Sequence, residues 1–272
     1  MSLGIAACGW APRADAEAVD SELLFLVDIT QTGMNTPQFN TLMDSYADAM
    51  TSTQVLDSIQ SGATGRIAVS MVFYGGAFTQ TVGVPWMSIG SMAEAQQFAN
   101  IVSNLSRPFS ISSPSIGAAL EFAANHFGTE TGGAANGFES AVQVVEVVAT
   151  SLPLFPNPAA DQAASNDALA SGVDIINSVA VGNRSSTVAD YFASNVIGGE
   201  VGSVEASSGR STINNSLDGY LAAHFGTTVE GGAEVSQLSA VPEPSSVAAL
   251  SAAAFLLFRR RRHEYSLTSG RA

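Results

Sequence analysis

An acid and two hydroxyls stand at alternate positions where a long apolar segment of the chain ends. The segment runs from Glu22 to Thr32, Glu-Leu-Leu-Phe-Leu-Val-Asp-Ile-Thr-Gln-Thr, and gives Asp28, Thr30 and Thr32 the spacing D-x-[ST]-x-[ST]. One carboxylate and two hydroxyls supply hard oxygen ligands of the kind that Mg²⁺ and Ca²⁺ accept. The alternative is a structural loop, in which Asp28 caps a turn and both threonines bond to nearby backbone.

The elements that position these residues follow from the apolar pattern. The run before Asp28 does not alternate, which is typical of a strand buried on both faces of a parallel sheet. Strands are predicted at 66–74, 141–149, 173–181 and 202–206, with 78–86 as a hairpin partner at the edge; helices are predicted at 36–62, 91–105, 116–126, 159–171, 188–196 and 211–224. This alternation predicts an α/β fold, a doubly wound, mostly parallel six-stranded sheet with helices on both faces and one antiparallel edge strand. Ligands of such sheets bind at the carboxyl ends of the strands, where Asp28 lies.

Composition narrows the possible functions. A chain of 272 residues with 46% hydrophobic content is long enough for one domain with terminal appendages. The net charge of −14 argues against a nucleic-acid partner, whose phosphates would be repelled. All ten basic residues are arginines, so a Walker A lysine, a Schiff-base lysine and a Ser-Lys dyad are excluded.

An extracellular hydrolase remains an alternative, but the sequence offers no site for one. Neither G-x-S-x-G nor H-E-x-x-H occurs in the chain. His126 and His224 fall in predicted helices and are interpreted as structural residues. Two acids could meet in space as a catalytic pair, although no spacing singles out such a pair. We therefore expect the protein not to be an enzyme.

The two ends of the chain differ in composition from the predicted domain at 20–225. Residues 1–19 resemble a secretory signal, with an apolar stretch around Cys8 and small residues up to Ala16, but without a positively charged leader. The stretch that ends at Cys8 is also similar to a lipoprotein box. A linker rich in Gly, Ser and Glu follows at 226–240.

The tail at 241–272 combines a short motif, an apolar run and a cluster of charge. The motif is Pro242, Glu243 and Pro244, the run spans 247–258, and the cluster is Arg259, Arg260, Arg261 and Arg262. The run is short for a bilayer span, which needs about 20 residues. The arginines would hold their end of such a segment on the cytoplasmic side.

The spacing at Asp28, Thr30 and Thr32 after a first buried strand resembles the von Willebrand factor type A domain, whose metal-ion-dependent adhesion site uses D-x-S-x-S. Segments that begin at Asp174 and Tyr191 are similar to an uncharacterised bacterial subfamily of this fold, a domain of unknown function. The resemblance covers residues 20–225. It implies a site for Mg²⁺ or Ca²⁺ built on Asp28 and the two threonines.

Two further loops of that family's site match less well. The family's second loop supplies a threonine that falls here on Pro114, so that only Ser113 or Ser115 could replace it, with a shifted loop. The third loop supplies an aspartate at a place occupied here by Thr150 or Ser151. With fewer charged ligands, a divalent ion would bind weakly.

The tail resembles a PEP-CTERM sorting signal. That resemblance implies export, transient membrane anchoring through the tail, and cleavage near Pro-Glu-Pro by an exosortase-type enzyme, in bacteria that often make an extracellular matrix. We therefore expect an exported, non-enzymatic surface or matrix protein that adheres to a protein or polysaccharide through the loops around Asp28. The alternative is a structural envelope or matrix component without a metal site.

Overall fold

The central strand of the protein is the apolar run that ends on Asp28. A computed structural model describes residues 16–108, 113–199 and 202–207. In it, β2 spans Ser21–Asp28 and all eight of its residues are buried. Parallel neighbours flank β2 on both sides, with Val27 opposite Phe73 of one strand and Val148 of the other. A strand in the middle of a sheet with two covered faces has no solvent side, so its apolar residues need not alternate.

The main sheet has six strands in the order β4-β3-β2-β6-β7-β8. Besides β2, the sheet contains β3 (Ile67–Tyr74), β4 (Gln80–Ile89), β6 (Gln143–Ala149), β7 (Ile175–Val181) and β8 (Val204–Ser207). Only β4, at one edge, pairs antiparallel, and the four other pairings are parallel. A separate short ribbon joins β1 (Glu17–Ala18) to β5 (Phe138–Glu139). The predicted sheet, with its single antiparallel edge strand, is confirmed.

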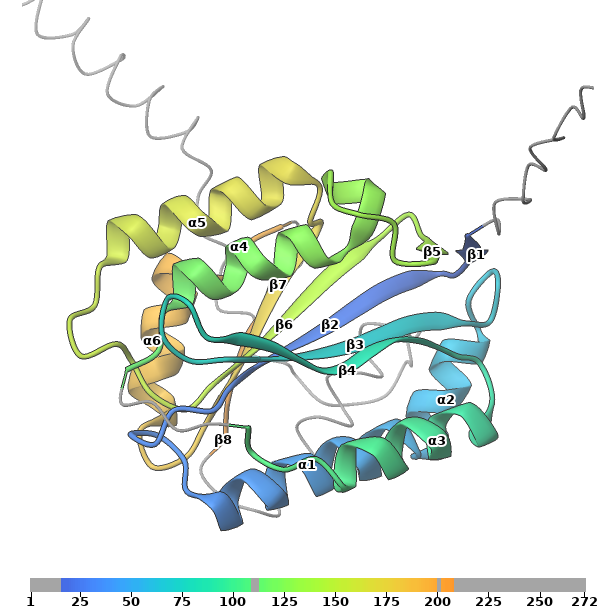
Figure 1. Ribbon diagram of the computed structural model, residues 1–272, viewed down its shortest axis with the longest axis horizontal. Helices are drawn as coiled ribbons and strands as arrows, with labels where there is room; N and C mark the ends of the chain where they lie inside the picture. The colour runs from blue at the N-terminus through green and yellow to red at the C-terminus, as the bar shows by residue number, and fades with distance from the viewer. Residues whose placement is uncertain (1–15, 109–112, 200–201, 208–272) are drawn as a thin grey trace, which may run out of the picture.

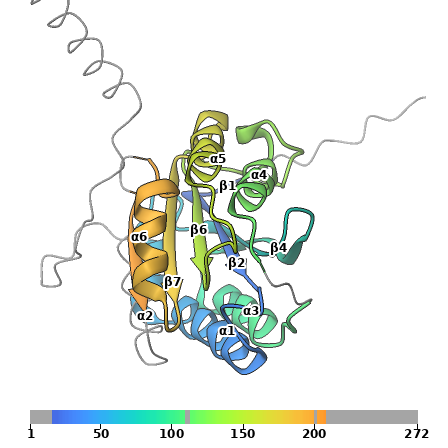
Figure 2. The ribbon, with the colours of Figure 1, turned by 90° about the vertical axis from the view of Figure 1, so that its left-hand side faces the viewer.

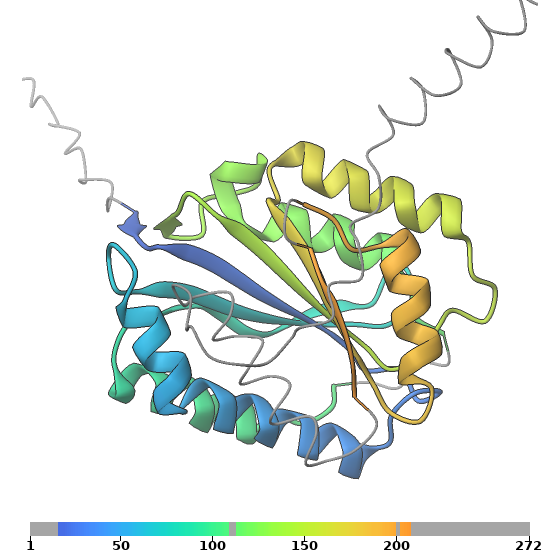
Figure 3. The same ribbon diagram turned by 180° about the vertical axis from the view of Figure 1, so that it is seen from behind.

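Helices cover both faces of the sheet, as Figures 1 and 2 show. One layer consists of α1 (Thr36–Met50), α2 (Thr53–Gln60) and α3 (Met92–Ser103). The other consists of α4 (Ile116–His126), α5 (Pro158–Ser171) and α6 (Ser185–Asn195), the last of which lies over β7 and β8 in Figure 3. Each layer packs its apolar side chains into its own buried cluster, and alternate residues of β2 point into the two clusters.

Local capping fixes where the first helices begin. Asn35 and Gln38 form a reciprocal capping box with Pro37 in the first turn, as the sequence predicts. The single helix predicted to run to residue 62 is wrong, because the structure divides it into α1 and α2. Ser52 takes an extended conformation between them and caps α2 through Val55 N–H. The apolar periodicity continues across this break and therefore does not reveal it. The boundary is set by the N-cap at Ser52.

Several expectations fall outside the described residues. These are the signal-like segment up to residue 15, the helix at 211–224 with His224, the linker, the Pro242–Pro244 motif and the arginine cluster. No helix in the described ranges is long and apolar enough to cross a membrane.

Candidate functional site

The carboxyl ends of β2 and β6 bring together residues that lie more than a hundred positions apart in the sequence. Asp28 is the last residue of β2, and Thr150 directly follows β6. Because these strands are parallel neighbours, their last residues meet at the same edge of the sheet. Thr30, Thr32 and Ser151 extend from the two loops that leave this edge. The sheet thus builds a common site from the predicted first and third loops.

The Asp28 carboxylate is fully buried and satisfied by hydrogen bonds from both loops. Oδ1 accepts the N–H of Thr30 at 2.8 Å. Oδ2 accepts the hydroxyl of Thr150 at 2.6 Å and its N–H at 3.2 Å, with the Ser151 hydroxyl at 3.5 Å. Burial raises the pKa of Asp28, while the hydrogen bonds from Thr150 and Thr30 oppose that rise. The carboxylate is therefore held in place without a cation.

Above this carboxylate, three hydroxyl oxygens form a triangle. Thr32 Oγ1 lies 3.4 Å from Thr30 Oγ1, and Ser151 Oγ lies 3.2 Å from each of these two oxygens. The edge of a ligand octahedron is about 2.9 Å for Mg²⁺ and about 3.3 Å for Ca²⁺, from their usual distances to oxygen. The three neutral oxygens, which are hydrogen-bonded to one another, therefore have the spacing of one face of a Ca²⁺ octahedron, and they would have to move closer together for Mg²⁺. Thr32 is exposed, so this face is open to solvent.

The donor set contains a single carboxylate. Among the described residues, no group of three His, Cys, Asp or Glu side chains lies together in a way that could hold a metal ion. Any cation over the hydroxyl triangle would depend on neutral oxygens, water and ligands from outside the chain. The oxygens have a suitable spacing, but the site carries the charge of only one carboxylate, so we expect it to bind a cation alone with low affinity.

The predicted second-loop residues do not join this triangle in the described structure. Ser113 Oγ accepts the N–H of Leu154 at 3.1 Å, which links the second loop to the loop after β6. Ser115 is the N-cap of α4 without a side-chain cap hydrogen bond, and its N–H donates to Gly75 O at 2.7 Å. Within the described residues, no hydrogen bond joins Ser113 or Ser115 to Asp28. Both serines instead connect neighbouring loops of the same edge.

Gly33 allows the loop after β2 to pack closely on the loop after β6. A Cβ atom at Gly33 would lie 2.6 Å from the backbone carbon of Thr150 and would collide with its hydroxyl. Such distances are not tolerated between real side-chain and backbone atoms, so one of the loops would have to move. The spacing of Thr30, Thr32 and Ser151 therefore depends on a residue without a side chain.

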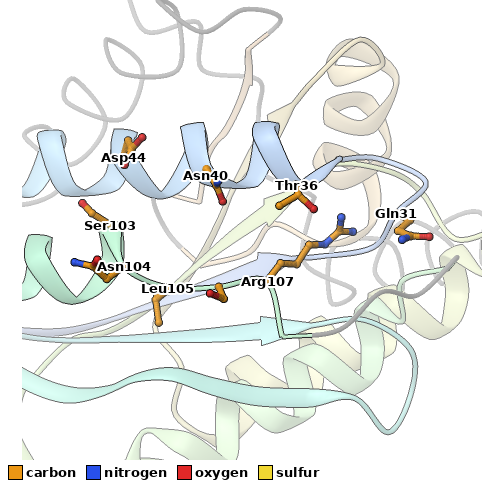
Figure 4. A pocket seen from close by; sticks show the side chains of 9 residues that line it. Gln31, Thr36, Asn40, Asp44, Ser103, Asn104, Leu105 and Arg107 are labelled. Atoms are coloured by element: carbon orange, nitrogen blue, oxygen red, sulfur yellow. The ribbon is translucent and has the colours of Figure 1, made fainter.

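Arg107 brings a positive charge to the loop after β2. Its guanidinium donates through Nε to Ile29 O at 2.8 Å, and its Nη2 donates to the same carbonyl. Burial lowers the pKa of Arg107, and the nearby charge of Asp28 raises it. The arginine borders a polar cleft of about 640 Å³ between the loop after β2, α1 and the segment after α3, lined by residues that include Gln31, Asn40 and Asn104 (Figure 4).

Exposed apolar side chains surround the same edge. Phe78 is 98% exposed in the turn after β3, and Leu154 and Phe155 are 74% and 87% exposed in the loop after β6. They are the three most exposed large apolar side chains of the described residues. Through Ser113 and Ser115, both loops are tied to the start of α4. We refer to Phe78, Leu154 and Phe155 as the apolar rim.

His126 lies away from this edge, in an aromatic environment. Its Nε2 is 3.0 Å from Ser70 Oγ, and its ring stacks on Trp86 and Phe122. Ser70 is fully buried in β3 and donates to Val84 O, so its hydroxyl is not available as a nucleophile. These contacts are those of a packed structural histidine.

The six-stranded sheet, its helix layers and the loop site together define a von Willebrand factor type A fold. A von Willebrand factor type A protein from Catenulispora acidiphila is similar, with a TM-score of 0.51 and 14% identity over 78% of this chain and 44% of that chain. The pilus adhesin SpaC from Lactobacillus rhamnosus GG gives a TM-score of 0.53 and 9% identity over 78% of this chain and 32% of that chain. This chain therefore spans less than half the length of either protein, and identities this low establish the fold alone.

The family of the chain follows from its sequence. The profile of DUF1194, described as a protein of unknown function, matches residues 18–221, and the chain belongs to this family. No curated protein matches the chain. The predicted fold, in a family without an assigned function, is confirmed, whereas the resemblance of the tail to a sorting signal concerns residues that the structure does not describe.

Proposed function

We propose that the protein is a non-enzymatic binding protein of the cell surface or extracellular matrix, and that it attaches to its partner through the edge around Asp28. The observation that carries this proposal is the apolar rim. Its three side chains expose large apolar surfaces that folding leaves uncovered, and aromatic residues of this kind often dominate binding energies at interfaces. All three lie in the loops that follow β3 and β6, the parallel neighbours of β2, and so at the same edge of the sheet as the hydroxyl triangle.

The rim favours a protein partner over a polysaccharide. Phenylalanine and leucine side chains gain most when they enter an apolar pocket, while the hydroxyls and the neighbouring polar cleft supply a hydrogen-bonding border. The chain is strongly acidic, so a partner surface with basic groups outside the contact would associate faster.

Mg²⁺ or Ca²⁺ is the cofactor that the hydroxyl triangle would accept. Thr30, Thr32 and Ser151 would each offer one oxygen, and Asp28 beneath them would supply the negative charge. Water or a carboxylate of the partner would fill the outer positions. Because the chain contributes so little charge, the cation would bind more tightly in the complex than in the free protein.

Export and anchoring are part of the same proposal. The signal-like residues 1–19, the thiol-free remainder of the chain and the tail around Pro242–Pro244 support secretion, temporary membrane attachment and release by an exosortase-type enzyme. The mature protein would then reside at the cell surface or in the matrix. Mass spectrometry of the extracellular protein tests this, because residues 259–262 still attached would contradict the proposed processing.

Adhesion of coated beads tests the binding function. Beads that carry the protein should attach to extracellular material of the producing cells, and Phe78→Ser with Phe155→Ser should reduce attachment at least tenfold. Met92→Ser, which changes an exposed apolar residue on α3, is the matched control and should have no effect. Equal attachment of the rim variant and the control would contradict a role for this edge.

The satisfied carboxylate favours a second candidate, a structural matrix or envelope component without a metal site. Both oxygens of Asp28 already have donors within the chain, and the second-loop position holds Pro114. Calorimetric titration of Mg²⁺, Ca²⁺ and Mn²⁺ separates the two. Mg²⁺ binding that disappears in Asp28→Asn but persists in Asp57→Asn, an exposed acid on α2, supports a cation-assisted site. The structural form is supported if the wild-type protein binds no Mg²⁺ and Asp28→Asn leaves bead attachment unchanged.

A further inference from the structure

A second buried acid lies at the opposite end of β2. Glu22 is the second residue of the strand, fully buried, and faces the same helix layer as Leu24 and Leu26. It is six residues before Asp28, which at the rise of a β-strand places the two carboxylates roughly 20 Å apart. Nothing in the loop site at Asp28 therefore acts on it directly.

The hydrogen bonds of Glu22 leave one of its oxygens without a partner. Oε1 accepts Asn136 Nδ2 at 2.8 Å, and Asn136 itself is fixed by bonds to Phe127 O and Phe138 N–H. Oε2 is buried and accepts no hydrogen bond of good geometry, although the nearby Gln143 amide lowers the pKa of Glu22. A buried carboxylate oxygen without a donor is strongly disfavoured, so this position calls for a proton, a buried water molecule or a cation.

A second carboxylate reaches the same region. Glu130 lies in the short 3-10 turn η1 (Gly128–Thr131), and its Oε1 is also buried without a partner. Burial raises the pKa of Glu22 to about 7, and the charges of Glu130 and Glu139 add to the rise, while Asn136 and Gln143 oppose it. None of these groups is cationic. Within the described part of the chain, the groups that act on Glu22 thus include two further acids and no basic side chain.

The backbone around Glu130 is built into a compact loop. Gly128, Gly132 and Gly137 have positive φ angles, and Gly133 N–H donates to Gly128 O at 2.6 Å. The carbonyl oxygen of Glu130 lies against Gly172, where a Cβ atom would come within 2.7 Å. This packing and the bond from Asn136 to Glu22 hold the loop at residues 128–137 beside the start of β2, where the charge of Glu130 acts on Glu22.

We propose that Glu22 Oε2 and Glu130 Oε1 bind a Ca²⁺ ion that ties the loop at 128–137 to the start of β2. Two carboxylates balance the double charge of the ion, and backbone carbonyls and water complete its shell. Ca²⁺ fits better than Mg²⁺, because it accepts irregular arrangements of oxygens and gives up its water more readily. The site is structural and separate from the loop site at Asp28.

Calorimetry with CaCl₂ at pH 8 tests the proposal on the full chain. The Asp28→Asn protein should still bind one Ca²⁺, and Glu130→Gln in the same background should weaken this binding at least tenfold. Glu121→Gln, an exposed acid on α4, is the matched control and should leave the affinity unchanged. Binding that is absent in the Asp28→Asn protein, or that survives Glu130→Gln, would overturn the proposal.

Hydrogen exchange locates the ion without relying on a variant. On addition of Ca²⁺ to the wild-type protein, the amides of residues 128–137 and of the start of β2 should exchange at least tenfold more slowly. Ca²⁺ protection confined to residues 29–33 and 150–151 would assign the ion to the other end of the strand and would contradict the inference. Unchanged exchange in every segment would mean that a proton or a water molecule, and not a cation, satisfies Glu22.

Discussion

The two ends of β2 treat a buried carboxylate in opposite ways. At the carboxyl end, Asp28 has donors for both oxygens, from Thr30 and from Thr150. At the amino end, Oε1 of Glu22 accepts a hydrogen bond from Asn136, whereas its buried Oε2 accepts none of good geometry. The loops after β2 and β6 provide the donors for Asp28, whereas the hydrogen bond to Glu22 comes from Asn136, in the loop before β5. Full burial alone therefore does not tell whether an acid needs a cation.

The largest expected effect is on the amino end and depends on pH. The pKa of Glu22 is raised from 4.5 to about 7. Because the pKa is raised in the folded protein, the contribution of Glu22 to the unfolding free energy is fully present below pH 4.5 and is lost as the pH rises through about 7. For a shift of this size the loss is about 3 kcal/mol. The Glu22→Gln side chain cannot ionise. In EGTA, the difference in unfolding free energy between this variant and the wild type should therefore shift by about 3 kcal/mol in favour of the variant between pH 4 and pH 8.

Urea unfolding of both proteins at the two pH values measures this effect, with Glu121→Gln as a control whose pH dependence should match the wild type. A wild-type protein with the same pH dependence as Glu22→Gln would show that Glu22 is satisfied after all. The contrast between the two ends of β2 would then disappear.

A smaller effect is expected where the two loops of the carboxyl end touch. Gly33→Ala places a Cβ against the backbone of Thr150, and overpacking of this kind should cost about 2 to 3 kcal/mol. Because the loops must separate, cation binding at Asp28 should fall as well. Gly132→Ala, at a glycine with a positive φ but open space around its Cβ, is a control for backbone strain without a clash. Gly33 is not among the glycines with a positive φ, so its loss reports the clash, whereas the loss at Gly132 reports strain alone. Thermal unfolding measures both, and a Gly33→Ala protein as stable as the wild type would show that the two loops can separate without cost.

Removing a donor from Asp28 is expected to cost about 2 kcal/mol at pH 8. Thr150→Val keeps the shape of the side chain but deletes the hydroxyl that donates at 2.6 Å to a buried charged group. The cost should shrink at low pH, because the hydrogen bond stabilises the ionised form and a protonated Asp28 depends on it less. Chemical unfolding at pH 8 and pH 4 measures both values. A cost that does not change with pH would mean that Asp28 remains neutral in the folded protein.

The sequence predicts the fold better than the site, for reasons that particular residues make clear. Local patterns predict several elements correctly: the apolar run before Asp28, the capping box at Asn35 and the edge strand at 78–86. The break at Ser52 is not predictable from periodicity, because the apolar positions continue across it. The hydroxyl of Ser151 meets that of Thr32 only because β6 lies beside β2, and the sequence does not state the order of strands. The pair of Glu22 and Glu130 is equally invisible, since more than a hundred residues separate two acids without any motif.

The smallest effect on stability is expected at Thr32, the exposed corner of the hydroxyl triangle. A change there tests whether the two ends of β2 bind cations independently. Thr32→Val removes a hydroxyl that makes only long contacts, 3.4 Å to Thr30 and 3.2 Å to Ser151, so the unfolding free energy should change by less than about 0.5 kcal/mol. Cation affinity at the Asp28 end should nevertheless fall about tenfold, because one of three oxygens is lost, while Ca²⁺ binding at Glu22 stays unchanged. Thr32→Ser, which keeps the hydroxyl, should restore the affinity. If calorimetry showed that Thr32→Val lowers the cation affinity at both ends of β2, the two sites would have to be coupled through a change of the whole strand, because no direct contact links them.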